Sequence, residues 1–369
     1  MELKSQFEEF LKNIRPTAAQ KEDWATGHDT LRGRLMSDVT LKPIIINTFL
    51  QGSIRRSTAI RPGNGKRPDV DLVVVTKLNA KVTPPDAALA MFVPFLNKHY
   101  AGKWRAQDRS MGIELSYVDL DLVITALPSD QNIALYESLY GMAAMTTNRT
   151  LEDAPDWRLN EDWRPDRNIL SQVINKDDNT DWKDHPLLLP DRQVRHWTRT
   201  HPLAQISWTT DKNKRTNGHY INVVRSTKWF RQEHIETMPK YPKGYPLEHF
   251  IGVCCPDGIT SVAEGIVKSF EAAVVKYRPY AQANIVPELP DHGVPEHNVF
   301  KRLDPEHFRL FMRELEKAAD VARRAFDHTD KYESAVLWNE LFGSAFKVPE
   351  PSFTPPAGPA NPQPTNRFA

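Results

Sequence analysis

The sequence predicts an α+β protein of two lobes, with a mixed sheet and helices in the first half and a helical bundle in the second. Three short runs rich in valine, isoleucine and leucine lie within the first 127 residues, and each has the composition of a buried strand. From about residue 218 onward, apolar residues recur instead at the spacing of amphipathic helices. The chain shows no internal repeat.

The first half is predicted to follow the order α-α-β-β-α-β. Amphipathic patterns indicate helices over residues 2 to 14 and about 18 to 36. The run KPIIINTFLQ then predicts a buried strand that ends at Gly52-Ser53. The remaining predicted elements are a strand at DVDLVVVT, a helix over residues 84 to 99, and a strand at GIELSYVDLDLVITAL over residues 112 to 127.

The second half has a different organisation. Residues 150 to 192 are rich in Asp, Asn, Trp and Pro, so we expect a long irregular crossing segment. We expect residues 1–200 to form the sheet-containing core with its N-terminal helices, and residues 201–346 to form the helical lobe. Residues 347–369 are expected to be a disordered tail, because seven of the last 21 residues are proline.

Composition limits the possible partners and location. The 369 residues carry a net charge of +1, from 48 basic and 47 acidic residues, so any attraction for phosphate must be local. The two cysteines are adjacent, which rules out a disulfide framework and fits a reducing cytoplasm. The N-terminus lacks the apolar segment of a signal peptide, and no 18-residue apolar run predicts a membrane span.

Four aspartates on two predicted strands form the candidate catalytic site. Side chains alternate along a strand, so Asp69 and Asp71 share one face, as do Asp119 and Asp121. Carboxylates this close repel each other unless a cation lies between them. Two Mg²⁺ ions held by such oxygens would clamp the attacking and leaving oxygens of a phosphoryl transfer. Solvated aspartates at strand ends are the structural alternative.

Gly52 and Ser53 supply a second candidate element before the first acidic strand. A Gly-Ser turn lets backbone N–H groups approach phosphate oxygens, and the hydroxyl adds a donor, although a simple strand-ending turn has the same sequence. Five basic residues follow and predict an entrance that attracts a triphosphate, or else a solvated loop: Arg55, Arg56, Arg61, Lys66 and Arg67.

These motifs resemble those of a known family. The Gly-Ser pair followed by DVD on a strand, with a later acidic strand, resembles the polymerase β-type nucleotidyltransferase fold. Over about residues 5 to 346 the chain resembles the bacterial cGAS/DncV-like nucleotidyltransferases, or CD-NTases. The run from FLQGSIRRSTAIRP to KRPDVDLVVVT is most similar to clade D of that family. The resemblance implies a two-lobed cage. The second-half segments that carry it are VVRSTKWFRQ, YPLEHFIG, DHGVPEHNVFKRL, AADVARRAFD and LWNELFGSAF.

The resemblance assigns the acidic triad to Asp69, Asp71 and Asp121, which would hold two Mg²⁺ ions. The family pattern after the third aspartate fits DLVITA from Asp121 better than DLDLVI from Asp119. The usual proline of that pattern is absent, so Asp119 stays a second candidate.

The resemblance also assigns three residues to the triphosphate: Gly52, Ser53 and Lys228. On a helical wheel Lys228 lies between Ile221 and Val224, so its ammonium group either faces inward towards an anion or extends to the rim of the lobe.

The activity implied by the resemblance is the synthesis of a cyclic oligonucleotide second messenger for bacterial antiphage (CBASS) defence. ATP and GTP would be the substrates, and a cyclic trinucleotide containing A and G, such as cyclic AMP-AMP-GMP, the product. Two alternatives remain: a non-cyclising nucleotidyltransferase that acts on a small molecule or an RNA end, and a nucleotide-binding scaffold without chemistry.

Two partner predictions also follow from the resemblance. A mobile tail with a small last residue is similar to family members whose C-terminus is conjugated by an E1–E2-like enzyme, which makes Ala369 a possible attachment point. Animal relatives carry a zinc-binding thumb before the lysine that matches Lys228, whereas His249, Cys254 and Cys255 follow it. Buried helix residues are therefore favoured over zinc, and no double-stranded DNA activator is expected.

Overall fold

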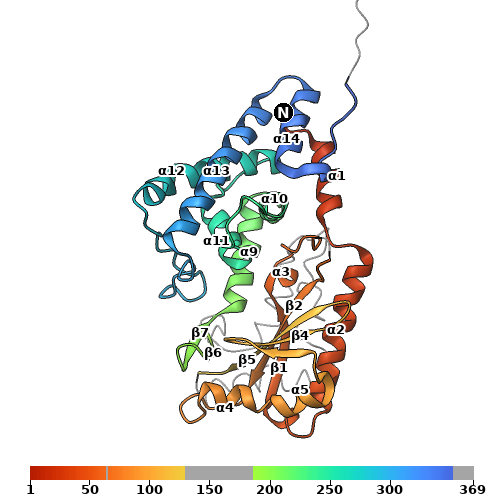
Figure 1. Cartoon of the computed structure of the whole chain (residues 1–369), viewed down its shortest axis with the longest axis vertical. Coiled ribbons are helices and arrows are strands. Elements are labelled where there is room, and N and C mark those ends of the chain that lie inside the picture. Colours follow the sequence, from red (N-terminus) through yellow and green to blue (C-terminus); the bar gives the residue numbers. More distant parts are fainter. Residues whose placement is uncertain (64, 129–185, 352–369) are drawn as a thin grey trace, which may run out of the picture.

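The computed structural model describes residues 1–63, 65–128 and 186–351 of the chain. Figure 1 shows a sheet with its helices at one end of the molecule and a group of helices at the other. Helix α9 (Pro202–Arg215) runs from the sheet towards the helical lobe. The predicted α+β class, with its helical second part, is confirmed.

The strands are β1 (Ile45–Gln51), β2 (Asp69–Thr76), β3 (Trp104–Ala106), β4 (Met111–Glu114), β5 (Asp119–Ala126), β6 (Leu187–Asp191) and β7 (His196–Thr200). Within the described ranges they form one sheet in the order β1-β2-β5-β4-β3, and β6 pairs with both β5 and β7. The central strands β2 and β5 are parallel, whereas the other pairs are antiparallel. The sheet is therefore mixed, and its two central strands begin at the same edge.

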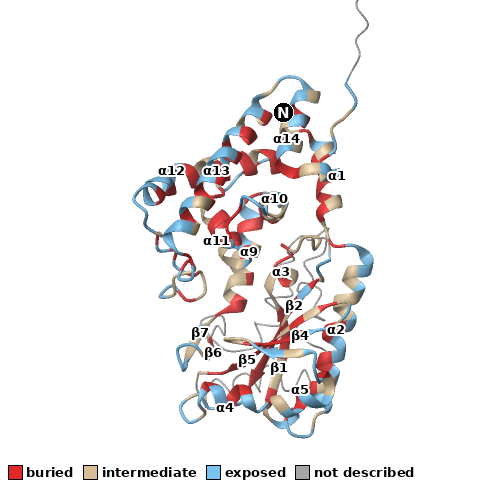
Figure 2. Cartoon of the chain, in the orientation of Figure 1, coloured by how far each residue is buried: buried red, intermediate tan, exposed pale blue. Residues whose placement is uncertain are grey.

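Among the described residues, the helices of the sheet half are α2 (Ala18–Ser37), α3 (Gly52–Arg55), α4 (Pro85–Ala90) and α5 (Val93–Tyr100). Alternation along β2 divides its apolar side chains between two cores. Leu72 packs with buried residues of α2 and α5 on one face, whereas Val73 packs with β6 and the first turns of α9 on the other. Figure 2 shows the central strands as mostly buried.

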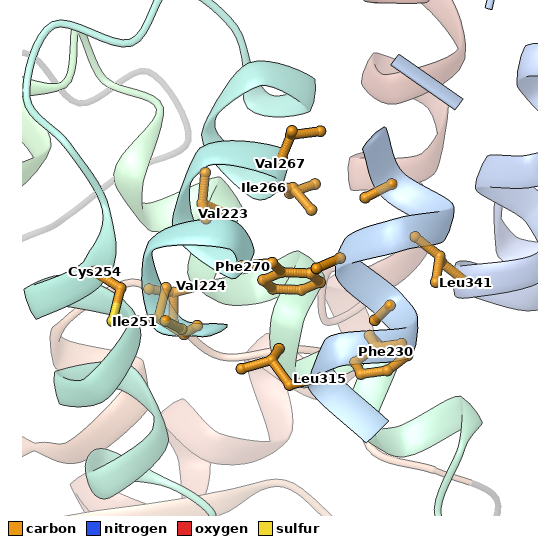
Figure 3. Close-up of a cluster of buried hydrophobic side chains, with 14 of the residues drawn as sticks. Val223, Val224, Phe230, Ile251, Cys254, Ile266, Val267, Phe270, Leu315 and Leu341 are labelled. Carbon is orange, nitrogen blue, oxygen red and sulfur yellow. The ribbon is translucent and has the colours of Figure 1, made fainter. Parts of the chain in front are cut away.

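The helical lobe has a core of its own. Besides α9 it contains α10 (Tyr220–Glu233), α11 (Tyr245–Cys254), α12 (Val262–Gln282), α13 (Pro305–Asp327) and α14 (Lys331–Phe342). Figure 3 shows Phe230, Phe270 and Leu315 from three of these helices in one buried cluster. Helix α1 (Lys4–Ile14) packs into the same core through Phe7 and Phe10, although it precedes the sheet in the sequence. The division of the chain at residue 200 stays a prediction.

Two predicted elements are each divided in the structure. The strand expected over residues 112–127 is two antiparallel strands, β4 and β5, because the chain reverses where the N–H of Leu115 donates to the carbonyl of Val118 at 3.0 Å. The helix expected over residues 84–99 is α4 followed by α5. Pro94 lies in the first turn of α5 and lacks the N–H that would continue a single helix.

The irregular segment expected over residues 150–192 is wrong at its end, where residues 187–191 form β6. Pro190 weakens the strand pattern in the sequence, and it is tolerated here in a short strand with few partners. The part of this prediction before residue 186 lies outside the described residues. So does the predicted tail beyond residue 351, whereas Lys347 at its start forms an ion pair with Glu9 at 2.9 Å.

In the portion of the chain that the structure covers, every helix is too short or too polar to cross a membrane.

Candidate active site

The aspartates of the two central strands lie side by side. In the parallel pairing, Asp69 is opposite Asp119 and Asp71 is opposite Asp121. Residues paired in register point to the same face, and these four lie on the face of Val73 rather than that of Leu72. The expected arrangement of acidic side chains from two strands on one face is therefore present.

The pKa values of three of these carboxylates are raised, as expected for acidic groups that lie close together. Asp69 begins β2 at an exposed position, yet the protein crowded around its carboxylate, followed by repulsion from Asp71 and Asp121, raises its pKa to about 7. Burial and then Asp121 raise the pKa of Asp71 to about 6. Burial also raises the pKa of Asp121. A divalent cation would relieve each of these effects, because it favours the ionised form of every neighbouring carboxylate.

Asp119 and Asp121 have different partners. The guanidinium of Arg67 donates to Asp119 Oδ1 at 2.8 Å, so this carboxylate already has a counter-charge. Asp121 Oδ1 instead accepts a hydrogen bond from the neutral Nε2 of Gln107 at 2.9 Å, and this bond opposes the rise in its pKa. Gln107 therefore fixes the orientation of Asp121 without neutralising it, which favours Asp121 over Asp119 as the third member of the triad.

The Gly-Ser turn lies directly against Asp71. Gln51 at the end of β1 pairs with Asp71, and the next residue, Gly52, has a left-handed φ of +72°. A Cβ added to Gly52 would lie 1.8 Å from Asp71 Oδ2, so only glycine allows this approach. Ser53 follows in α3, and its carbonyl accepts a hydrogen bond from the N–H of Thr58 at 2.8 Å. The predicted phosphate-binding turn and one predicted metal ligand are thus neighbours.

Lys228 faces inward rather than extending to the rim of the lobe. Its side chain is 11% exposed, and its Nζ lies 2.6 Å from Glu248 Oε1 and 3.0 Å from the carbonyl oxygen of Thr58. Burial lowers the pKa of Lys228, and Glu248 opposes this change. The sequence pattern therefore located the lysine, but it did not identify Glu248 as its partner.

The five basic residues after the Gly-Ser turn differ in exposure, and the alternative of a solvated loop is wrong for two of them. Arg55 and Arg56 are each 5% exposed, so neither lies in a solvated loop. Arg56 pairs with Glu248, and Arg67 pairs with Asp119. Arginines in a loop sequence suggest solvent exposure, but here Arg56 pairs with the buried Glu248 of the helical lobe, whereas Arg67 pairs with the half-exposed Asp119.

An open hollow of about 410 Å³ lies beside the acidic strands. Asp69 and Asp121 form part of its wall, together with Arg67, Arg105 and Gln107. Its volume lies in the range of small-molecule sites, and its wall offers both carboxylates and basic groups. The hollow therefore offers space beside Asp69 and Asp121, whereas the predicted phosphate-binding residues Gly52, Ser53 and Lys228 do not line it.

The donor set suits magnesium. In the regions described here, no three His, Cys, Asp or Glu side chains are already gathered tightly enough to hold a metal ion. The carboxylates nevertheless share one face, and two of them have pKa values near neutrality that a cation would lower. Oxygen-only ligands with room for substrate phosphates match the preferences of Mg²⁺.

The residues weighed for zinc are packed inside the lobe. His249 stacks on His292 with ring centroids 3.7 Å apart. Cys254 and Cys255 are buried, and burial raises the pKa of the Cys254 thiol to about 12. A zinc site needs thiolates, which this environment disfavours.

The site combines paired aspartates on the central strands of a mixed sheet with a Gly-Ser turn that packs against one of them. This combination defines a class of enzyme that transfers nucleotidyl groups. The protein is a nucleotidyltransferase, and comparison with known proteins identifies its family. Residues 1–133 match the family model described as the Second Messenger Oligonucleotide or Dinucleotide Synthetase domain, SMODS.

Two curated relatives align with the whole chain. It is 52% identical to the "Probable cyclic AMP-AMP-GMP nucleotide synthase" of Salmonella paratyphi B and 51% identical to the "Cyclic AMP-AMP-GMP synthase" of Enterobacter hormaechei subsp. hoffmannii, with 100% of both chains covered in each case. The solved structure of the Bradyrhizobium diazoefficiens CD-NTase CdnG with GTP shares the fold, with a TM-score of 0.63 at 12% identity over 92% of this chain and 95% of that one. The chain belongs to the CD-NTase family, and its place in clade D stays a prediction.

Proposed function

We propose that this protein makes a cyclic trinucleotide second messenger containing A and G from ATP and GTP, and that it acts in antiphage defence. The names of two relatives at 52% and 51% identity over the full chain support the product, cyclic AMP-AMP-GMP. The observation that carries the enzymatic part is the in-register pairing of Asp71 with Asp121 beside Gly52.

In this proposal Asp69, Asp71 and Asp121 hold two Mg²⁺ ions. When bound, the ions supply charge neutralisation at the α-phosphate and lower the pKa of the attacking 3′-hydroxyl. Gly52 leaves room for the Asp71 carboxylate, and Gln107 keeps that of Asp121 oriented. Ser53 and Lys228 would bind the triphosphate and steady the departing pyrophosphate. The same groups would serve the later ring-closing step.

The experiment combines two measurements on the full chain. Pyrophosphate release from ATP and GTP is followed with and without Mg²⁺, and the products are separated by chromatography after phosphatase treatment. We expect Mg²⁺-dependent release and a phosphatase-resistant product with the mass of a cyclic trinucleotide. Asp71→Asn should reduce the rate by about 10³-fold, since charge stabilisation is the largest part of such catalysis.

Each alternative predicts a different result. A non-cyclising nucleotidyltransferase would release pyrophosphate only with an acceptor, and its product would not be a phosphatase-resistant ring. A nucleotide-binding scaffold would release no pyrophosphate under any condition. Either result would overturn the proposed function.

The E1–E2-like partner is part of the same proposal, although Ala369 lies outside the described residues. Removal of residues 349–369 should leave synthesis in vitro unchanged and reduce signalling in cells. Loss of synthesis in vitro would instead mean that the tail contributes to the enzyme itself.

A further inference from the structure

A buried group of three charged side chains joins the two lobes beside the aspartates. We call Arg56, Lys228 and Glu248 the ion cluster. Arg56 follows α3 in the sheet half, whereas Lys228 and Glu248 come from α10 and α11 of the helical lobe. Arg56 Nε lies 2.9 Å from Glu248 Oε2, and Lys228 Nζ lies 2.6 Å from Glu248 Oε1. One carboxylate therefore holds two cations, one on each oxygen.

The ion cluster is also connected to the Gly-Ser turn. The N–H of Arg56 donates to the carbonyl of Gly52 at 3.1 Å. Lys228 Nζ donates to the carbonyl of Thr58, whose own N–H donates to the carbonyl of Ser53. Both cations of the ion cluster are thus tied to the backbone that would surround the phosphates.

The ion cluster is largely closed to water, with the Lys228 side chain 11% exposed, and it has an unbalanced charge. The side chains of Arg56 and Glu248 are 6% and 4% exposed. Two cations share one anion, so one positive charge is left over. It lies within electrostatic range of Asp71, whose pKa both cations lower. A buried positive charge beside a carboxylate site fits the phosphates of a bound nucleotide better than water.

We infer that Glu248 is a positioning residue for the triphosphate: it fixes Arg56 and Lys228 against the Gly-Ser turn so that their excess charge faces the phosphates. This inference rests on the proposed function, because it assumes a nucleoside triphosphate substrate. Glu248 itself does not touch the nucleotide. It acts through two cations that would otherwise repel each other and separate.

The test uses three variants of the full chain. Glu248→Gln removes the charge and keeps the shape of the side chain. Glu248→Asp keeps the charge but shortens the side chain by one methylene group. Glu314→Gln is the matched control, because Glu314 is also a buried lobe glutamate with two basic partners, Arg313 and Lys317. The readouts are KM and kcat for ATP, inhibition by inorganic tripolyphosphate, and binding of adenosine.

We expect Glu248→Gln to raise the KM for ATP and the inhibition constant of tripolyphosphate about tenfold or more, with a smaller change in kcat and unchanged adenosine binding. Glu248→Asp should give an intermediate effect, and Glu314→Gln should match the wild type. If Glu248→Gln fails to fold, Glu248→Asp decides with the same readouts.

Three outcomes separate the possible failures. If tripolyphosphate inhibits the Glu248 variants as it does the wild type, the inference is wrong. If the variants lose affinity for ATP and adenosine equally, Glu248 has only a structural role and the inference is again wrong. If the wild type itself releases no pyrophosphate from ATP and GTP, the proposed function has failed instead.

Discussion

Asp71 of the sheet and Glu248 of the helical lobe lie within electrostatic range of each other, yet their pKa values are shifted in opposite directions. The surrounding protein and mutual repulsion raise the pKa of Asp69 to about 7 and that of Asp71 to about 6. Burial alone would also raise the pKa of Glu248. The positive charges of Arg56 and Lys228 lower it by more, so the pKa of Glu248 lies well below its usual range.

This difference shows where the protein leaves room for a ligand. The sheet side carries excess negative charge, which divalent cations would balance. The ion cluster, to which both lobes contribute, carries one more positive than negative charge, which phosphates would balance. Strong pKa shifts next to a cleft are typical of functional sites. Here the negative excess matches the magnesium ions, and the positive excess matches the phosphates, of a nucleotide bound with magnesium.

The largest expected effect compares two aspartates of β5. Asp121→Asn should reduce pyrophosphate release by about 10³-fold, because Asp121 lies opposite Asp71 and its hydrogen-bond donor, Gln107, is neutral. Asp119→Asn should reduce it less than about tenfold, since Arg67 already neutralises Asp119. Equal losses would mean that both aspartates bind metal, and a larger loss for Asp119 would reverse the assignment.

The next effect tests the contact between the Gly-Ser turn and Asp71. Gly52→Ala should lower kcat about 100-fold, because its Cβ would displace the Asp71 carboxylate. Gly102→Ala is the control, since Gly102 has the same φ of +72° but nothing within 4 Å of an added Cβ. Both variants should lose roughly 1–2 kcal/mol of stability from backbone strain. Similar kcat values for the two would show that the contact with Asp71 is unimportant.

Much of this site could be predicted from the sequence because it depends on local rules. Alternation along a strand places Asp69 and Asp71 on one face, and a Gly-Ser pair after a strand indicates a turn. The role of Glu248 could not be predicted in the same way. Its partner Arg56 is separated from it by 192 positions, and only the packing of one lobe on the other brings them together.

The fold shows the same limit. The helical character of the second half, which includes α12 and α13, could be predicted because its apolar residues recur at helical spacing. The turn that separates β4 from β5 was not predicted, since the run GIELSYVDLDLVITAL is compatible with one continuous strand. Gln107 was also missed, because an isolated glutamine in a loop carries no signal until its contact with Asp121 is known.

A smaller effect is expected when the support of Asp121 is removed. Gln107→Ala should lower activity roughly tenfold, as is usual for groups that orient metal ligands. The hydrogen bond from Gln107 opposes the rise in the pKa of Asp121, so its loss should raise that pKa further. The acid limb of the pH–rate profile should then move to higher pH. An unchanged limb would mean that Gln107 does not act through Asp121.

The smallest effect concerns stability. At pH 8, above its pKa of about 7, Asp69 is ionised and repelled by its neighbours, so Asp69→Asn should raise Tm by roughly 2 °C without Mg²⁺. The raised pKa means that the folded state binds more protons than the unfolded one, and this repulsion disappears as the pH falls below 7. The gain should therefore be clearly smaller at pH 5, and it should vanish only near pH 4, where the unfolded carboxyl is protonated as well. A gain of the same size at pH 8 and pH 5 would exclude charge repulsion as its cause.

A crystal structure with Mg²⁺ and a non-hydrolysable ATP analogue tests the central claim most directly. We predict metal ions at about 2.0–2.1 Å from carboxylate oxygens of Asp71 and Asp121, with the analogue's phosphates between them and Lys228. Metal or phosphates bound away from these two aspartates would contradict the account.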